Sequence, residues 1–377
     1  MKKSTDSSSN STNSGSSYVT DRRKEWEEKR KLEKEKEIEE QKKILKEMEA
    51  EKKRKITEFL KEYPPSRIKA ELNEYIVDQP SLTKAVSDFL YYQALRYKYP
   101  DLPSRPLLIC GPSGSGKTEV WRVAKKLYSE IFKITFINAA NITSDGWSGS
   151  NKLANYLTCT ASNSILVFDE FDKCASPRYS IGGVNTSADM QSEFLKVIED
   201  NDYIVKGKSD VEYIIKNLGV VFVGAFESIR EEKTQIVSQA IGFGSQPPEQ
   251  PKYHGINRTD LVEFGVLPEL LGRIAVVVNT RPISEEQCLK IVRNSKSRLT
   301  VISDLLAENG IDAWKDLSDE VIINMIKNSD FGKFGFRSVL SKIENIMLQN
   351  IHENGLVPPP TDENEIVDEL DNEIPRI

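Results

Sequence analysis

The sequence predicts an α/β fold: a parallel β-sheet covered by helices, followed by a smaller all-α domain. Apolar runs without alternation recur between helical segments, which is typical of strands buried on both faces of a parallel sheet. A glycine-rich loop follows the first of these runs and leads into a helix. After Ile283 the pattern becomes wholly helical through about Leu348, which predicts the second domain.

Length and composition indicate a chain with a substantial core. It has 377 residues, of which 38% are hydrophobic and 29% charged, and its net charge of −6 gives no general case for nucleic-acid binding. The four cysteines are scattered without a C-x-x-C pair, which argues against a zinc site and a disulfide framework and favours a cytoplasmic protein. No apolar run is long enough to span a membrane, and serines follow Met1-Lys2-Lys3 where a signal peptide needs an apolar segment.

The ends of the chain differ in composition from its middle. Residues 1–20 are rich in serine and predict a disordered tail, and residues 21–63 are rich in lysine and glutamate and predict a charged helix. The sparse apolar residues of that helix leave two interpretations open, a coiled coil that recruits partners and a single exposed helix. We expect a large α/β domain over 64–282, a small helical domain over 283–355 and an acidic disordered tail over 356–377.

The elements of the large domain follow in order from Pro64-Pro65, which ends the charged helix. Helical segments over Arg67 to Leu95 are interrupted near Tyr75 to Gln79, and a further helix is expected over Glu119 to Tyr128. Five apolar runs are the predicted strands of the sheet: Leu107–Cys110, Ile134–Asn138, Ser164–Phe168, Val220–Val223 and Ile274–Val278.

The glycine-rich loop carries the clearest chemical signal. It has the form G-x-x-x-x-G-K-[ST] and consists of Gly111, Pro112, Ser113, Gly114, Ser115, Gly116, Lys117 and Thr118. Its glycines let backbone N–H groups converge on phosphate oxygens at a helix N-terminus. Lys117 supplies a charge to the β- and γ-phosphates, and the Thr118 hydroxyl can ligate Mg²⁺. The sequence therefore predicts a nucleoside triphosphate site.

Two carboxylates follow the third predicted strand, at the sheet edge where open α/β sheets bind ligands. Asp169 is expected to hold Mg²⁺, and Glu170 to orient and deprotonate the water that attacks the γ-phosphate. A pair of acids after a strand is often only a solvated strand end. Placed about fifty residues after a phosphate-binding loop, it predicts hydrolysis in addition to binding.

These motifs resemble those of the AAA+ ATPases, and within them the ClpX-type Clp unfoldases, with the HslU-type ATPases next. The ordered series that carries the resemblance covers roughly Pro64 to Leu348: Tyr75–Gln79, Gly111–Thr118, Asp169–Lys173, Val221–Phe226, Gly265–Arg273 and Phe334–Ser338. The resemblance implies ATP and Mg²⁺ as ligands, with Ile76 and Val77 against the adenine. Asp78 departs from the family, which usually has glycine there.

The same resemblance assigns roles to two arginines. Arg273 would reach the γ-phosphate held by a neighbouring subunit, and Arg337 would contact the phosphates from the small domain of its own chain. A cation that neutralises charge in the transition state can accelerate phosphoryl transfer by several powers of ten. An arginine that acts on a neighbour makes the monomer incomplete, so the resemblance implies a homo-hexameric ring.

Two loops would contact other proteins. Trp147, in the position of the family's first pore loop, keeps the aromatic bulk of the usual tyrosine and is expected to grip protein substrates; a partly buried loop anchor is the alternative. Ile241, Gly242 and Phe243 stand where ClpX-type proteins dock a ClpP-like peptidase. A loop folded back on its own domain would explain the same residues.

The resemblance implies an ATP-dependent unfoldase that threads proteins through a hexameric pore and into a ClpP-like peptidase, as ClpX-type proteins do. Two family features have no counterpart: the four-cysteine zinc-binding domain that begins ClpX-type proteins, and their basic Arg-Lys-His loop, near which only Lys206-Gly207-Lys208 is found. The alternative function is a non-proteolytic remodeller, recruited to one partner complex by the N-terminal helix. A nucleic-acid motor is disfavoured, because no basic stripe with interleaved aromatics occurs outside the N-terminal arm.

Overall fold

The computed structural model describes residues 30, 36, 39–40, 43–44, 46–143, 152–158, 160–180, 182–199, 202–206, 212–230, 255–328 and 336–354. The chain divides into two compact units, Met1–Phe59 and Leu60–Ile377. In the first unit, residues 46–59 are helical, and Arg54 pairs with Glu51 at 2.7 Å and with Glu58 at 3.4 Å. Such exposed pairs along a helix contribute little to stability, because water screens the charges.

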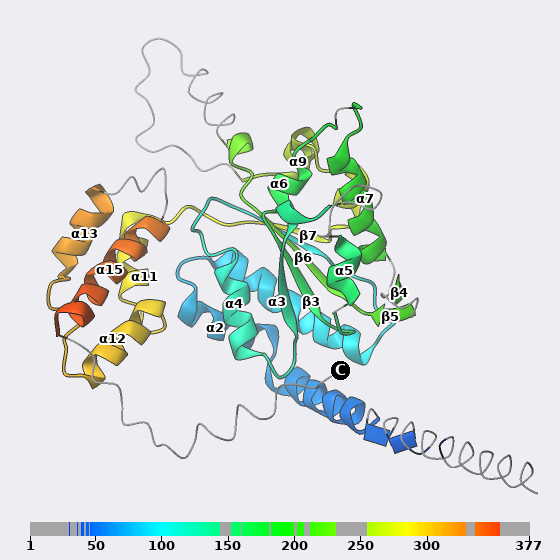
Figure 1. Ribbon diagram of the computed structural model, residues 1–377, viewed down its shortest axis with the longest axis horizontal. Helices are drawn as coiled ribbons and strands as arrows, with labels where there is room; N and C mark the ends of the chain where they lie inside the picture. The colour runs from blue at the N-terminus through cyan, green and yellow to red at the C-terminus, as the bar shows by residue number, and fades with distance from the viewer. Residues whose placement is uncertain are drawn as a thin grey trace, which may run out of the picture. The chain divides into compact units, whose positions relative to one another are not determined.

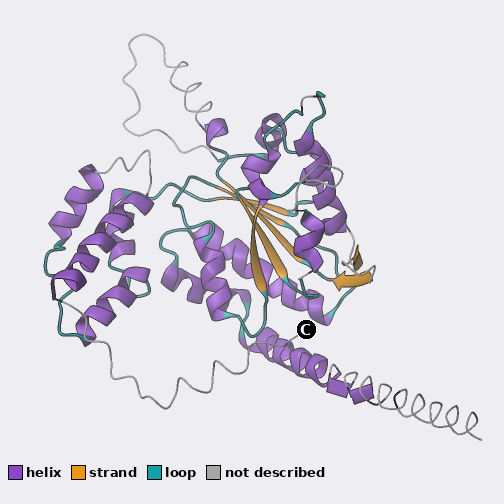
Figure 2. Ribbon diagram, in the orientation of Figure 1, coloured by secondary structure: helices purple, strands orange, loops and turns teal. Residues whose placement is uncertain are grey.

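A five-stranded parallel sheet forms the centre of the second unit (Figure 2), as the sequence predicted. Its strands lie in the order β2-β3-β6-β1-β7, so that the chain crosses over the sheet between sequential strands. Their bounds are Leu107–Cys110 for β1, Ile134–Asn138 for β2, Ile165–Asp169 for β3, Gly219–Gly224 for β6 and Val276–Asn279 for β7. Parallel pairs need such crossovers, and helices supply them.

Helices cover both faces of this sheet (Figure 1). Those before and between the strands are α2 (Pro65–Tyr75), α3 (Pro80–Lys98), α4 (Glu119–Leu127), α5 (Leu153–Thr158), α6 (Phe171–Ala175) and α7 (Thr186–Glu199). Two more, α9 (Arg258–Phe264) and α10 (Pro268–Arg273), precede β7, and the 3₁₀ turn η1 (Ala139–Asn141) follows β2. Trp121 of α4 packs edge-on against Phe89 of α3 at 5.5 Å between ring centroids, which joins two of the covering helices.

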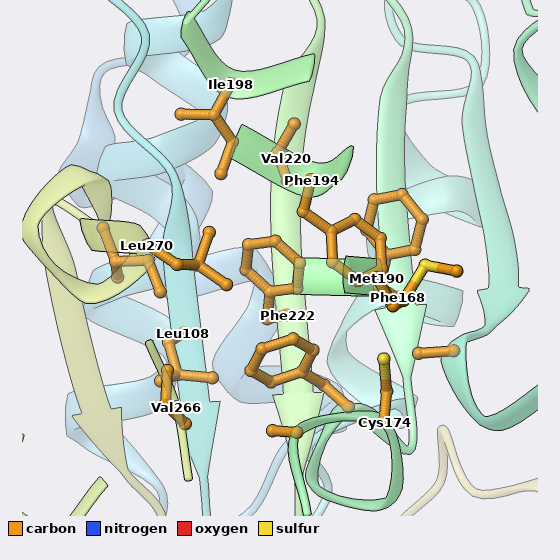
Figure 3. Packing of buried hydrophobic residues seen from close by; sticks show 14 of the residues in the cluster. Leu108, Phe168, Cys174, Met190, Phe194, Ile198, Val220, Phe222, Val266 and Leu270 are labelled. Atoms are coloured by element: carbon orange, nitrogen blue, oxygen red, sulfur yellow. The ribbon is translucent and has the colours of Figure 1, made fainter. Parts of the chain in front are cut away.

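Aromatic side chains fill one side of the sheet (Figure 3). Phe168 of β3 stacks on Phe222 of β6 at 5.6 Å, and Phe194 of α7 packs edge-on against both. All three are fully buried, as is Leu108 of β1 in the same cluster. The intervening strand residues are also buried, so the strands read as continuous apolar runs rather than alternating ones.

The helices after β7 have a core of their own. They are α11 (Glu285–Val292), α12 (Arg298–Glu308), α13 (Asp319–Asn328) and α15 (Phe336–Asn354). Their buried residues form a separate hydrophobic cluster, in which Leu299, Leu306, Ile322 and Ile343 are fully buried. Helix α11 begins with a capping box, in which Ser284 and Gln287 satisfy each other's backbone N–H groups. The helical pattern read after Ile283 is thus observed.

Two features differ from the sequence reading. The last strand begins two residues later than expected, at Val276. The N–H groups of Ala275 and Val276 both donate to Pro106 O, just before the regular pairing with β1 starts. A separate antiparallel hairpin, β4 (Asp202–Lys206) and β5 (Glu212–Lys216), was not predicted at all. Among the helices of the described residues, none combines the length and apolar character needed to cross a membrane.

Candidate functional site

The candidate site lies at the carboxyl end of the parallel sheet. Strand register aligns Asn138 with Asp169 at the ends of β2 and β3, and aligns Cys110 with Gly224 and Asn279 at the ends of β1, β6 and β7. The phosphate-binding loop leaves the end of β1, which lies between β6 and β7 in the sheet. Open α/β sheets bind their ligands at this edge, because loops from neighbouring strands converge there.

The phosphate-binding loop has the backbone that its glycines allow. Gly114 and Gly116 have φ of +77° and +88°, in the left-handed region where a side chain is strained. At its start, the Gly111 N–H donates to Gly224 O of β6 at 3.3 Å, which fixes the loop to the sheet. Residues from Ser113 to Thr118 line a cavity of about 730 Å³. Gly111 and Pro112 are not among its lining residues.

Lys117 is held inside this loop. Its Nζ donates to Gly111 O at 2.6 Å and to Pro112 O at 2.7 Å, and the residue is 8% exposed. Burial lowers the pKa of Lys117 to about 8, and the nearby Arg230 acts in the same direction. The folded chain therefore favours the neutral amine more than the unfolded chain does, and an anion placed in the loop would restore the preference for the ammonium.

Thr118 and Asp169 meet in the cavity. The Thr118 hydroxyl donates to Asp169 Oδ2 at 2.9 Å, and the other carboxylate oxygen accepts the Glu170 N–H at 2.9 Å. A hydroxyl and a carboxylate side by side are hard oxygen donors of the kind that Mg²⁺ prefers. These two side chains therefore fit the metal site that the sequence predicted.

Glu170 has a left-handed backbone conformation, and its carboxylate contacts two donor side chains. Its φ is +57°, in the left-handed region, where it ends β3 and begins α6. Its Oε2 accepts a hydrogen bond from Asn138 Nδ2 at 3.2 Å and pairs with Lys173 Nζ at 3.1 Å. Asn138 is itself oriented, because its Oδ1 accepts the Ala140 N–H at 2.9 Å and so leaves the amide nitrogen facing Glu170.

The wall of the cavity opposite the sheet edge comes from two other segments. Tyr75, Ile76, Val77 and Gln79 line it from the break between α2 and α3. The helical domain adds lining residues from each of three places: Ile283 before α11, Ile291 and Asn294 around its end, and Arg337 and Leu340 on α15. The cavity thus has an apolar side and a charged side, as a nucleotide with a base and phosphates requires.

The backbone conformation and the ion pair of Asp78 account for an aspartate at a position where ClpX-type proteins usually have glycine. It has a φ of +54°, a conformation that glycine adopts freely and that aspartate tolerates better than most residues. Its carboxylate pairs with Lys290 Nζ of α11 at 3.6 Å. A side chain at this left-handed position therefore adds a link to the helical domain that glycine could not make.

The two arginines have different surroundings. Arg337 lines the cavity from the first turn of α15, and Gly114 lies so near this turn that a Cβ on it would be 3.3 Å from the Phe336 backbone nitrogen. Arg273, at the end of α10, does not line the cavity of its own chain. Its side chain is 60% exposed and pairs with Glu199 at 2.7 Å.

The two protein-contact loops expected from the sequence lie outside the described residues. Trp147 falls in the gap 144–151, and Ile241, Gly242 and Phe243 fall in the gap 231–254. Their roles remain predictions. Sequence reasoning missed Asn138, Lys173 and Gln79 as residues of the site. Lys173 could have been noticed, because it lies one helical turn after Glu170, where side chains of a helix meet.

Comparisons with known proteins agree with this geometry. Residues 107–237 match the family model described as ATPase family associated with various cellular activities (AAA). The chain is 26% identical over 307 residues to the ATP-dependent Clp protease ATP-binding subunit ClpX 2 of Wolinella succinogenes, and this match covers 74% of the chain and 75% of the relative. It is also 26% identical over 318 residues to the subunit ClpX of Treponema denticola, with the same two shares covered.

The matched region contains the strand, loop and helix of the phosphate site, the acidic pair after β3 and strand β6. The relatives extend the similarity through most of the chain, in agreement with the ordered series of motifs. Residues 107–237 therefore match an AAA ATPase domain, and over most of its length the chain is similar to ClpX-type AAA+ ATPases.

Proposed function

We propose that this ATPase is a protein unfoldase that works as a homo-hexamer, threads protein substrates through the central pore and delivers them to a ClpP-like peptidase. The observation that carries the ATP-driven part is the meeting of Thr118, Asp169 and Glu170 at one edge of the cavity, with Arg337 entering it from the helical domain. This combination favours hydrolysis, because Glu170 is a second carboxylate beyond the one that would hold Mg²⁺, and it can take a proton from an attacking water.

Each side chain has a part in the reaction. Lys117 exchanges its two loop carbonyls for phosphate oxygens and brings its charge to them. Glu170 takes the proton from the attacking water, and the donors Asn138 and Lys173 restrain its carboxylate before the reaction. Arg337 stabilises charge on the phosphates. Bound Mg²⁺, held by Thr118 and Asp169, would supply further charge neutralisation.

The exposed position of Arg273 supports the ring. It does not line the cavity of its own chain, and among the described residues its side chain makes an exposed ion pair with Glu199. An exposed pair of this kind contributes little, about 0–1 kcal/mol, so exchanging Glu199 for a neighbour's phosphate has a small cost. We infer that Arg273 completes the site of the adjacent subunit.

The loop between α6 and α7 supports the proposal that the protein contacts polypeptide substrates. Between α6 and α7, Tyr179 is 70% exposed and Val184 is 49% exposed. The two flank a narrow hairpin, in which the Ser180 N–H donates to Val184 O at 2.9 Å and Tyr179 bridges to Asn185. Two bulky apolar side chains presented on a loop are suited to gripping an extended chain of any sequence. We propose that this loop acts with Trp147 on the substrate.

The test is ATP-dependent unfolding of a tagged fluorescent protein by the full chain and by two loop variants. We expect Trp147→Ala and Tyr179→Ala to hydrolyse ATP at close to the parental rate and to unfold substrate at least about tenfold more slowly, because loop contacts transmit work without taking part in the chemistry. Trp147→Tyr is the matched control and should keep unfolding, because it retains an aromatic ring.

A ClpP-type peptidase is then added to the same assay. Degradation of the unfolded substrate by the parent, and its loss in Phe243→Ala with unfolding retained, is the result expected for peptidase docking. Unfolding without degradation points to the alternative function, a non-proteolytic remodeller recruited through the unit Met1–Phe59. Normal ATPase activity with no unfolding of any model substrate would overturn the threading proposal.

A further inference from the structure

Thr280 lies behind the phosphate-binding loop, in a place to which no function has been assigned. It directly follows β7, and its N–H donates to Cys110 O at 2.8 Å, which continues the pairing of β7 with β1. The residue is fully buried. Its Oγ1 lies 2.6 Å from the Oγ of Ser115 in the loop, and the two residues are 165 positions apart in the chain.

The two hydroxyls form a directed chain. Each hydroxyl has one hydrogen to donate. Ser115 Oγ lies 2.8 Å from Pro112 O, whereas Thr280 Oγ1 lies 3.4 Å from Cys110 O. Because the serine has the closer carbonyl to donate to, the contact of 2.6 Å is best made by the Thr280 hydroxyl donating to Ser115. The chain ends on Pro112 O, the carbonyl that also accepts from Lys117 at 2.7 Å. Thr280 is therefore linked through one serine to the carbonyl that holds the loop lysine.

The loop has no free space towards Thr280. A Cβ built on Gly111 would overlap Thr280 Oγ1 and would come within 2.9 Å of Thr280 Cβ. The first residue of the loop thus packs with its bare Cα against the threonine side chain. A shift of the loop in this direction must move Thr280 as well.

The next residue is held by the other side of the nucleotide cavity. Gln79 lies in the segment that lines the wall opposite the sheet edge, and it is 5% exposed. Its side-chain amide donates to Arg281 O at 2.8 Å and accepts the Arg281 N–H at 3.0 Å. The pair of bonds holds the Arg281 backbone as a neighbouring strand would.

Thr280 and Arg281 are also where the connection to the helical domain begins. Ile283 lines the cavity, and α11 starts at Glu285. The connection thus leaves from a point that is tied to the phosphate side through Ser115 and to the opposite wall through Gln79. A change in the loop that accompanies a bound phosphate reaches the first residue of the connection through one hydrogen bond.

We propose that Thr280 is a positioning residue for ATP hydrolysis, whose buried hydroxyl couples the phosphate-binding loop to the connection that places the helical domain and its Arg337. Thr280 itself does not touch the nucleotide. The proposal rests on the role of Arg337 proposed above. It adds the residue that sets where Arg337 stands when the loop is occupied.

The experiment measures kcat and KM for ATP with the full chain. Thr280→Val keeps the shape of the side chain and removes the hydroxyl; we expect kcat to fall about tenfold and KM to change less than about threefold, because the backbone N–H groups of the loop remain. Thr280→Ser restores the hydroxyl and should return kcat to within about twofold of the parent. Thr160→Val is the matched control, since it removes a hydroxyl bonded to Tyr156 O at the end of α5.

The link to Arg337 is tested by a double-mutant cycle. If Thr280 acts by placing Arg337, adding Thr280→Val to Arg337→Ala should lower kcat by less than about twofold further. Losses that multiply overturn the coupling, as does a Thr280→Ser enzyme as slow as Thr280→Val. Parental kcat in Arg337→Ala alone would instead remove the proposed role of Arg337. Should Thr280→Val fail to fold, Ser115→Ala removes the same bond from the loop side and is expected to give the same split between kcat and KM.

Discussion

Glu170 shows at the scale of one residue how this site combines strain with restraint. Its left-handed backbone, at a φ of +57°, turns the chain sharply from β3 into α6. Such a conformation costs a non-glycine residue about 1 kcal/mol and persists where the surrounding structure holds it. Here the Glu170 N–H donates to Asp169, and Asn138 and Lys173 both hold the same carboxylate oxygen. These contacts therefore hold the Glu170 carboxylate, the proposed base, in a fixed position.

Removing one of these donors should change basal hydrolysis. We expect Asn138→Ala to raise the basal ATPase rate by about twofold to fivefold, because a Glu170 carboxylate released from this donor can turn more readily toward the attacking water. Lys173→Met should act in the same direction. ATPase assays in the absence of protein substrate measure the effect, with Asn141→Ala, three residues along in the exposed η1 turn, as the control. A fall in rate as large as that of Glu170→Gln would mean that the donors orient the base for catalysis instead of restraining it.

The residue scale also shows what could be read from the sequence. The contact between Thr118 and Asp169 follows from a loop and a strand end that meet at one sheet edge, and the sequence predicted both. The partners of those residues could not be predicted in the same way. Asn138 and Thr280 are ordinary polar residues after strands, and they acquire a role only because strand order places β2 beside β3 and β7 beside β1. No local pattern encodes that order.

At the scale of elements, continuous apolar runs were a reliable guide to strands, whereas strands that mix polar with apolar residues were not recognised. The five strands of the sheet were predicted because each is a continuous apolar run between helices. The hairpin of β4 and β5 is short and mixes polar with apolar residues, so it was not recognised. Its backbone register places Asp202 opposite Lys216 and Lys206 opposite Glu212, a pairing that follows only from knowing which strands are partners.

The contact between α2 and α4 supplies an element-scale prediction. The Tyr128 hydroxyl, just after α4, donates to Glu71 Oε2 of α2 at 2.8 Å, and the Tyr128 ring lies edge-on to Tyr63 at 6.0 Å. Tyr128→Phe keeps the ring and removes the bond, so we expect the free energy of unfolding to fall by about 1–2 kcal/mol. Urea unfolding measures this value. Tyr92→Phe is the control, because its hydroxyl bonds to Pro103 O at an exposed site.

The same tyrosine gives this prediction a pH dependence. Burial, together with the hydrogen bond to Glu71, raises the pKa of Tyr128 above the ordinary value. As the pH rises past about 10, the phenol ionises in the unfolded chain before it does so in the folded one, and the stabilisation decreases. The difference in stability between the parent and Tyr128→Phe should therefore be constant below pH of about 10 and shrink above it. A difference that stays constant to pH of about 11 would contradict a buried, bonded phenol.

At the scale of the whole molecule, the nucleotide cavity lies where two hydrophobic cores meet. One core includes β3, β6 and α7 and the other lies within the helices from α11 to α15, and each was expected from the sequence as a separate domain. Among the described residues, polar contacts join the two domains beside the cavity: Asp78 with Lys290, and Asn294 with Glu74 O. Contacts of this kind can rearrange at small cost, which would suit movement of the two domains during hydrolysis.

The last prediction concerns the ring, because only an assembly can use Arg273 as proposed. Arg273→Ala and Lys117→Ala should each be almost inactive alone, the first for want of a neighbour's arginine and the second for want of its own phosphate site. In rings assembled from equal amounts of the two, a competent site arises where an Arg273→Ala subunit, with Lys117 intact, receives Arg273 from a Lys117→Ala neighbour. Random assembly gives this arrangement at about a quarter of the interfaces, so we expect up to about a quarter of the parental ATPase rate. Rings mixed from Lys117→Ala and Glu170→Gln are the control. They should stay inactive, because each change damages the nucleotide site of the subunit that carries it, so no subunit in the mixed ring has an intact site. If Arg273 served the site of its own chain, the first mixture would contain no intact site and would be as inactive as the control.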